Sequence, residues 1–292
     1  FKQHNDEFRR MVGVSRSKSS YYKYRSVYRL LAAYVRERCR RADIPFRELD
    51  KRFLAGFHQY IARESPHKKN TAWVYMIAFK HILMLARSRD LLSADLFAGY
   101  RLRSEFVARD YLTETEIRRL MLLAPTDRTQ RLVLDAFLFS CFTGLSYIDI
   151  RQLKPANIRY TQGQLWIGTT RRKTGSEVYV RLFAVPNAIL SRYLTDAADE
   201  PIFALPSNGW CNACLRRLLP EAGIVRPITF HVARHTFATT ITLSQGVAIE
   251  TISKLLGHRN IRTTQIYAAV THAKLEGDME RLSRQLDACY RL

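Results

Sequence analysis

The stretch LGHRNIRTTQIY at residues 256–267, together with HVARHTFAT at residues 231–239, decides how this sequence is interpreted. The two stretches supply a tyrosine hydroxyl, histidines and an arginine. Breaking a phosphodiester without a metal requires a nucleophile, cations around the developing charge and an acid for the leaving oxygen. These residue types therefore suit attack by Tyr267 on a phosphodiester. A tyrosine hydroxyl ordinarily has a pKa of about 10, so it must lose its proton during attack or be activated by its neighbours.

Both stretches resemble the catalytic box of the tyrosine recombinase (phage integrase) family, which reads His-x-x-Arg, then Leu-Gly-His, then Tyr nine residues later. His258 and Tyr267 are separated by that nine-residue step. The resemblance implies that Tyr267 is the nucleophile, Arg234 the second catalytic arginine, and His231 and His258 phosphate and proton-transfer partners. The residue types agree, because an arginine can hold two phosphate oxygens and the three-residue step from His231 to Arg234 shares one helical face. A core tyrosine, a surface ion pair and a capping histidine are the ordinary alternatives.

A turn between two predicted strands carries further basic residues. Residues 164–170 and 177–182 have the composition and alternation of a β-hairpin, with Arg171, Arg172 and Lys173 between them. The resemblance implies that Lys173 protonates the leaving 5′ oxygen, while an exposed turn lysine is the plain alternative. Arg171 and Arg172 are candidate phosphate contacts.

The string FTGLSYID at residues 142–149 departs from the family at one place. Most members have the first catalytic arginine after Thr-Gly-Leu, whereas this chain has Ser146, as is common in the branch on mobile elements of Bacteroides-type bacteria. By analogy with a lost oxyanion donor, the missing charge costs about 10²–10³ in rate unless another group replaces it. Arg131 and Arg151 are candidate substitutes. Arg151 would point about 140° away from Ser146 on a shared helix, and Arg128 and Arg131 could approach only through tertiary folding, so the choice stays open.

Composition places the chain among basic proteins. The net charge over 292 residues is +21, and residues 1–108 hold 23 Lys and Arg against 10 Asp and Glu. Such a charge attracts polyanions, and the resemblance implies that the partner is double-stranded DNA. No apolar run reaches about 18 residues, so we expect no membrane segment. The resemblance implies a bacterial, cytoplasmic protein that is associated with the nucleoid when bound to DNA. The five cysteines indicate reduced thiols, and Cys211-x-x-Cys214 lacks a second pair for zinc. We expect neither metal nor cofactor.

The predicted fold is mainly α-helical with a small β-sheet in the second domain. Helical periodicity over residues 1–105 predicts a helical bundle, which the resemblance identifies as a SAM-like core-DNA-binding domain. Residues 106–111 are charged and aperiodic, as in a linker. Thr113-x-x-Glu116 is a capping box that opens the catalytic domain, residues 112–292.

DNA contacts in the first domain are predicted from basic and polar residues near helix starts. These candidate contacts are Lys18, Ser20, Lys68, Lys69, Asn70 and Lys80. Because relatives on mobile elements carry an additional N-terminal arm-binding domain, we expect that a chain starting at Phe1 is truncated.

The last predicted helix has an apolar stripe, which consists of Leu275, Met279, Leu282, Leu286 and Cys289. The resemblance implies that this helix docks on a neighbouring protomer and that four protomers assemble on synapsed DNA, while packing on its own domain is the plain alternative. The implied function is site-specific recombination. A type IB topoisomerase-like enzyme is one alternative, and a DNA-binding regulator with impaired catalysis, suggested by Ser146, is another.

Overall fold

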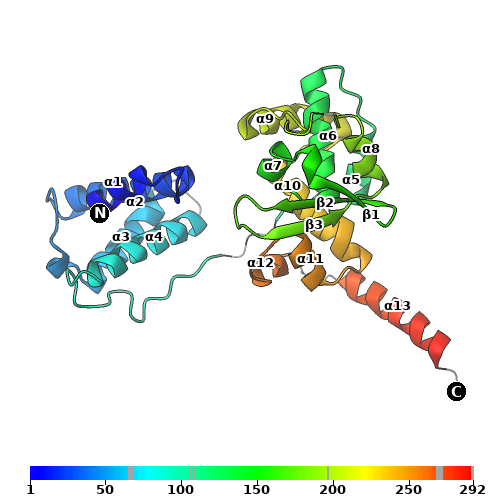
Figure 1. Cartoon of the computed structure of the whole chain (residues 1–292). Helices are drawn as coiled ribbons and strands as arrows, with labels where there is room; N and C mark the ends of the chain where they lie inside the picture. Colours follow the sequence, from blue (N-terminus) through cyan, green and yellow to red (C-terminus); the bar gives the residue numbers. More distant parts are fainter. Residues whose placement is uncertain (65–68, 106, 108, 196, 268–271, 291–292) are drawn as a thin grey trace. The chain divides into compact units, whose positions relative to one another are not determined.

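The computed structural model describes residues 1–292 except 65–68, 106, 108, 196, 268–271 and 291–292. The chain forms two compact units, Phe1–Val107 and Ala108–Leu292 (Figure 1), and the boundary along the chain falls within residues 106–111, the segment predicted to be a linker. Each unit has its own hydrophobic core. The mainly helical architecture with one small sheet in the second unit is confirmed.

Aromatic packing holds the first unit together. The helix that buries Tyr24 and Val27 begins where the Ser17 hydroxyl accepts a hydrogen bond from Ser20 N at 3.1 Å. Tyr34 on this helix packs against the rings of Phe53 and Phe57. The helices of this unit are α1 (Lys2–Arg10), α2 (Lys18–Arg38), the 3₁₀ turn η1 (Phe46–Glu48), α3 (Lys51–Glu64) and α4 (Lys69–Arg87).

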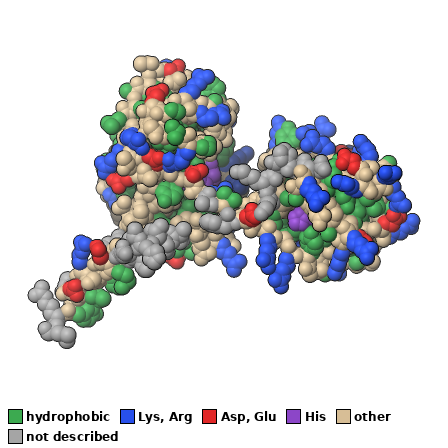
Figure 2. Space-filling model, turned by 180° about the vertical axis from the view of Figure 1, so that it is seen from behind, with side chains coloured by type: hydrophobic (Ala, Val, Ile, Leu, Met, Phe, Trp, Pro, Cys, Tyr) green, Lys and Arg blue, Asp and Glu red, His purple; other side chains and the backbone are tan. Residues whose placement is uncertain are grey.

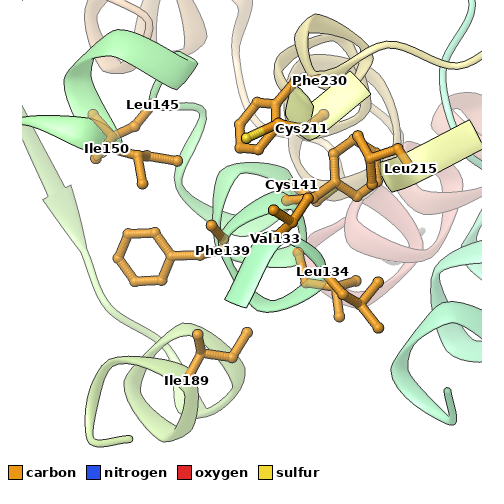
Figure 3. Packing of buried hydrophobic residues seen from close by; sticks show 14 of the residues in the cluster. Val133, Leu134, Phe139, Cys141, Leu145, Ile150, Ile189, Cys211, Leu215 and Phe230 are labelled. Atoms are coloured by element: carbon orange, nitrogen blue, oxygen red, sulfur yellow. The ribbon is translucent and has the colours of Figure 1, made fainter. Parts of the chain in front are cut away.

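The second unit is built around one buried helix, α6 (Arg128–Thr143). It begins after Asp127, whose side chain caps the helix, and ends at Gly144. The φ of Gly144 is +69°, a left-handed conformation that residues with a side chain rarely adopt. Its apolar residues, including Val133 and Phe139, lie at the centre of the core shown in Figure 3. Most of the side chains of α6 from Val133 to Thr143 are buried.

The unit contains further helices, which in chain order are α5 (Glu114–Met121), α7 (Tyr147–Arg151), η2 (Pro155–Asn157), α8 (Ala184–Leu190), α9 (Asn208–Leu218), η3 (Leu219–Ala222), α10 (Phe230–Thr236), the π-helical η4 (Phe237–Thr242), η5 (Leu243–Gln245), α11 (Ile249–Leu255), α12 (Arg262–Gln265) and α13 (His272–Cys289). Helices α5, α7, α8, α9, α10 and η4 pack against α6. The predicted capping box is present, because Thr113 and Glu116 exchange hydrogen bonds at the start of α5.

The sheet contains the predicted hairpin and one further strand. Strands β2 (Gln164–Thr170) and β3 (Glu177–Arg181) pair antiparallel with Ile167 opposite Val180. Strand β1 (Ile158–Thr161) pairs antiparallel with β2 at the sheet edge. Sequence reasoning did not identify β1, because three of its four side chains are exposed and it lacks the alternation that marks a half-buried strand. Helix α11 packs against β3, which brings the hairpin beside the loop that follows α11.

The second unit fixes its own first residues firmly. Leu112 donates its backbone N–H to Thr236 Oγ1 at 2.9 Å and accepts from Thr240 Oγ1 with its carbonyl. Arg226 forms an ion pair with Glu116 and donates to the carbonyl of Tyr111 at 2.8 Å. The entering chain is therefore tied to the end of α10 and to the middle of η4.

Helix α13 displays apolar side chains to solvent. Met279, Leu282 and Leu286 are each more than 40% exposed, whereas the side chain of Leu275 lies outside the described residues. Within the described part of the chain, no helix combines the length and the apolar character needed to cross a membrane.

Candidate active site

Helix α10 positions three candidate site residues, His231, Arg234 and His235. Its first residue, Phe230, packs edge-on against the rings of Phe137 and Tyr147 and anchors the helix in the core. Arg234 is only 4% exposed, and His231 is exposed at the surface. The predicted three-residue spacing thus places one cation deep in the unit and one imidazole at its rim.

The Arg234 guanidinium is held by main-chain oxygens. Nη1 donates to the Gly144 carbonyl at 2.7 Å, and Nη2 donates to the Leu256 carbonyl. Burial and then the neighbouring Arg171 lower the pKa of Arg234, but a guanidinium stays protonated at neutral pH. The arginine therefore provides a fixed, desolvated positive charge, which is the kind of group that stabilises an anionic phosphate.

His258 is held in one tautomer by its two partners. Arg234 Nη2 lies 2.9 Å from His258 Nε2, and Thr264 Oγ1 lies 2.8 Å from His258 Nδ1. Since arginine can only donate, Nε2 must accept and Nδ1 carries the proton that is donated to Thr264. Burial, followed by the charges of Arg234 and Arg171, lowers the pKa of His258 to about 4.

The loop that carries His258 depends on a glycine. Gly257 has a φ of +62°, and a Cβ there would approach Arg171 Cγ at 2.7 Å and Val178 Cγ2 at 2.8 Å. Gly257 therefore lets the loop lie against the hairpin, and Thr174 Oγ1 donates to its carbonyl at 3.4 Å.

Tyr267 lies just beyond α12 and is 9% exposed. Its ring packs in a small apolar cluster with Phe237, Ile252 and Leu256. Its hydroxyl oxygen lies 2.8 Å from His235 Nδ1. Burial raises the pKa of Tyr267, and the charges of Arg234 and Arg109 oppose that rise. The candidate nucleophile is thus a neutral phenol within the electrostatic reach of the buried arginine.

Arg171, at the end of β2, joins the cluster from the hairpin. It is 7% exposed, and its Nη1 lies 2.7 Å from Asp149 Oδ2 as an ion pair. Among the described residues this Nη1 has no hydrogen-bond acceptor in good geometry. Its charge acts on both Arg234 and His258. A buried, incompletely satisfied guanidinium beside a second one is suited to hold an anion.

Ser146 is used locally. Its hydroxyl donates to Asp149 Oδ2 at 2.5 Å, and Asp149 in turn accepts from the Ser146 backbone at the start of α7. Asp149 also accepts from the Arg172 backbone at 3.1 Å. The position where the family usually has an arginine therefore orients the carboxylate that pairs with Arg171.

The two arginines predicted as substitutes lie elsewhere. Arg131 donates to the Leu123 carbonyl at 3.3 Å and lines a cavity of about 320 Å³ near α8. Arg151 is exposed at the end of α7, beside the Tyr147 hydroxyl. In the described chain, Arg171 is the arginine whose charge acts on both Arg234 and His258.

Two residues of the hairpin turn are exposed. Lys173 lies close enough for its charge to lower the pKa of both His231 and His258, after burial and other neighbouring charges. Arg172 points to solvent and contributes its backbone N–H to Asp149. The turn therefore places an exposed cation at the rim of the cluster.

Sequence reasoning missed His235 and Asp149 as site residues. His235 follows Arg234 directly in the sequence. Because a helix turns about 100° per residue, the neighbouring position lies on a different face of the helix, so the sequence did not indicate that both residues belong to one site. From the sequence, Asp149 indicated only a carboxylate near the start of a helix. No group of three or more metal-ligating side chains is found in the part of the chain that the structure describes, and the thiols of Cys211 and Cys214 are buried with raised pKa values.

The candidate DNA contacts of the first unit have varied positions. Lys18 lies over the Tyr22 ring and Lys80 over the Phe97 ring. Ser20 is half-buried at the start of α2. Asn70 pairs through its amide with both backbone groups of Glu105, at 2.9 and 2.7 Å, so it fastens the end of the unit. Lys68 and the side chain of Lys69 lie outside the described residues. On the face shown in Figure 2, Lys and Arg side chains are spread over this unit.

Comparison with known proteins gives matches along both units. The profile of the Phage integrase family matches residues 110–274, and that of the Phage integrase SAM-like domain matches residues 1–102. Tyrosine recombinase XerA of Pyrococcus furiosus is 30% identical over 185 residues, which cover 58% of this chain and 60% of that protein. Tyrosine recombinase XerD of Listeria monocytogenes is 45% identical over 149 residues, 46% of this chain and 48% of that protein. The matches thus span about half to 60% of these relatives.

Solved structures share the fold. The Tn1549 transposon integrase in complex with a circular intermediate DNA has a TM-score of 0.69 at 17% identity and covers 96% of this chain and 98% of its own. The XerH site-specific recombinase bound to a palindromic difH substrate has a TM-score of 0.71 at 17% identity, covering 89% of this chain and 79% of its own.

Proposed function

This chain belongs to the phage integrase family of tyrosine recombinases, and on that premise we propose that it cleaves and rejoins double-stranded DNA at specific sites. The observation that carries the proposal is a cluster of Arg234, Arg171 and His258 that act on one another, with Arg234 also acting on the Tyr267 hydroxyl. Two buried guanidinium groups form a site for a phosphate, and the phenol is the nucleophile beside it.

The proposed reaction uses side chains throughout. The Tyr267 oxygen attacks the scissile phosphorus and forms a 3′-phosphotyrosyl bond while the bond to the 5′ oxygen breaks. Lys173 gives its proton to that 5′ oxygen. The new 5′ hydroxyl of a partner strand then attacks the phosphotyrosyl linkage, so the bond energy is kept without a high-energy cofactor.

We also propose that Arg171 supplies the charge that the family usually takes from the position of Ser146. The ion pair with Asp149 fixes the Arg171 side chain, and Ser146 fixes Asp149 in turn. Arg171 therefore reaches the cluster from β2, while Ser146 supports it indirectly. Ser146 supports placement in the branch on Bacteroides-type mobile elements.

One experiment tests the function without knowledge of the target sequence. The whole chain is incubated with a randomised duplex library that carries a nick in one strand, and DNA that stays on the protein after SDS denaturation is sequenced. A recombinase should enrich a defined site and then exchange strands between two copies of it. Adducts without sequence preference, together with relaxation of supercoiled plasmid, would favour the topoisomerase alternative. Absence of any adduct would favour the regulatory alternative.

Lys173→Ala should slow cleavage of ordinary DNA but not of DNA with a 5′-bridging sulfur at the scissile position. A thiolate leaves without needing a proton, so the general acid becomes dispensable. General acid catalysis contributes about 10²–10⁴-fold, which sets the expected loss on ordinary DNA. Single-turnover cleavage of both substrates measures it, with Arg172→Ala as the neighbouring control. A Lys173→Ala defect that is equal on both substrates would exclude the general-acid role.

The first unit should bind DNA mainly through phosphates. Its net positive charge predicts an affinity that falls steeply with salt, by about 0.9 in the log–log slope for each phosphate neutralised. Titration of the isolated unit Phe1–Val107, which has its own core, measures the slope. The unit Ala108–Leu292 serves as the comparison. A slope near zero for the first unit would show that it does not hold the DNA backbone.

We propose that α13 docks on a neighbouring protomer and that a tetramer forms on two synapsed sites. The exposed apolar side chains of Met279, Leu282 and Leu286 need a partner surface to leave water. Leu282→Asp combined with Leu286→Asp should weaken synapsis at least tenfold and leave single-site binding unchanged. A band-shift titration with one and two sites measures both, with Ser283→Asp as control. Normal recombination by the double variant would contradict docking in trans.

We also propose that the protein is cytoplasmic and that it acts on a mobile element.

A further inference from the structure

The Tyr267 hydroxyl has a partner that the mechanism above does not use. His235 Nδ1 lies 2.8 Å from the Tyr267 oxygen, and the two rings are 5.2 Å apart between centroids. Both residues are less than 10% exposed, so the contact is shielded from water. The reacting oxygen therefore already touches a group that can take a proton.

The surroundings keep His235 uncharged. His231 and Arg234 lie on the same helix, Arg109 lies on the entering segment and His258 on the loop after α11. Burial and these groups lower the pKa of His235 to about 4. An uncharged imidazole has one nitrogen without a proton, and with the proton on Nε2 the Nδ1 atom accepts from the phenol.

The other two histidines are less suited to that role. Both ring nitrogens of His258 are engaged, one by Arg234 and one by Thr264. His231 is exposed and meets His235 ring to ring, at 4.6 Å between centroids, with His235 contacting Tyr267 as well. In the described structure, His235 is thus the histidine in hydrogen-bond contact with the nucleophile.

We propose that His235 is the general base that removes the phenolic proton of Tyr267 during cleavage. The inference rests on the proposed recombinase function. As the Tyr267 oxygen forms its bond to phosphorus, its proton passes to His235 Nδ1, and the bond to the 5′ oxygen breaks with a proton from Lys173. In the rejoining step the 5′ hydroxyl returns its proton to Lys173, and His235 returns its proton to the departing phenolate. Arg234 attracts the transient negative charge on the phenol oxygen.

The test separates proton transfer from mere positioning. His235→Asn keeps a hydrogen-bond acceptor near the place of Nδ1 but cannot take a proton at neutral pH. Single-turnover cleavage of the site recovered from the randomised library should fall about 10²–10⁴-fold in His235→Asn and in His235→Ala. The matched control is His58→Asn, because His58 Nδ1 and the Tyr100 hydroxyl form the same kind of pair at 2.9 Å in the first unit.

A fluorinated tyrosine at position 267 supplies the decisive readout. Fluorination makes the phenol more acidic, so it loses its proton without a base. Fluorination should raise the cleavage rate of His235→Asn at least tenfold and leave the rate of Lys173→Ala unchanged. A 5′-bridging sulfur should restore the rate of Lys173→Ala and leave the rate of His235→Asn unchanged. A normal rate in His235→Asn, or a defect that fluorination leaves unchanged, would overturn the inference while adduct formation by the unmodified chain still supports the recombinase function. If the unmodified chain forms no adduct, the recombinase function itself fails.

Discussion

Tyr267→Phe is expected to abolish the covalent protein–DNA adduct completely. The substitution removes the attacking oxygen and leaves the ring in its apolar cluster with Phe237, Ile252 and Leu256. The lost contact is one hydrogen bond to His235, which typically contributes about 1 kcal/mol to stability. Folding and DNA binding should therefore stay close to those of the unmodified chain. SDS gel electrophoresis after incubation with a nicked suicide duplex measures the adduct.

The matched control for this variant is Tyr100→Phe, which removes a hydroxyl paired with His58 in the first unit. Tyr100→Phe should form adduct at the normal rate. Adduct that persists in Tyr267→Phe would assign the nucleophile to another side chain and would overturn the mechanism proposed here.

Arg171→Ala is expected to slow cleavage by about 10²–10³-fold, the scale for loss of one group that stabilises an oxyanion. Arg171 holds a buried guanidinium with an unsatisfied nitrogen in the cluster, whereas its neighbour Arg172 is exposed. Arg172→Ala is therefore the control and should change the rate by less than about threefold. Arg171→Lys keeps the positive charge but loses the planar guanidinium, so its cleavage rate should lie between those of Arg171→Ala and Arg172→Ala. Single-turnover cleavage at saturating protein measures the chemical step.

A second substitution should restore part of the cleavage rate lost in Arg171→Ala. If Arg171 replaces the arginine missing at Ser146, then Ser146→Arg introduced into Arg171→Ala should restore at least tenfold of the lost rate. Removing Arg171 also leaves Asp149 buried without its ion-pair partner, so the unfolding of each variant is measured alongside. Equal rates for Arg171→Ala and Arg172→Ala would show that the cluster does not depend on Arg171.

Local features of the fold were predictable from the sequence because neighbouring residues determine them. The capping box at Thr113 and Glu116 and the buried helix α6 depend on spacing along one element. The β2–β3 hairpin followed from alternation and from the turn around Gly175. The edge strand β1 did not, because its pairing with β2 and not its own pattern creates it.

The site was predictable as a set of residue types but not as a set of contacts. Tyr267, Arg234 and His258 were candidates from spacing, and the structure brings Arg234 into contact with His258. The pairing of Arg171 with Asp149 joins β2 to the start of α7 and exists only after folding. The contact between His235 and Tyr267 likewise joins α10 to the chain after α12. Such contacts depend on tertiary packing, so Arg131 and Arg151 seemed equally eligible from the sequence alone.

The fastening of Leu112 has a mechanical consequence. Its N–H and its carbonyl are tied to Thr236 and Thr240, which follow Arg234 and His235 within the next two turns. A force along the chain before Leu112 would therefore be transmitted through these two hydrogen bonds to α10, which carries Arg234, and to η4. A flexible loop would absorb such a force by extending. The segment that enters the second unit is therefore mechanically coupled to the helix of the candidate active site.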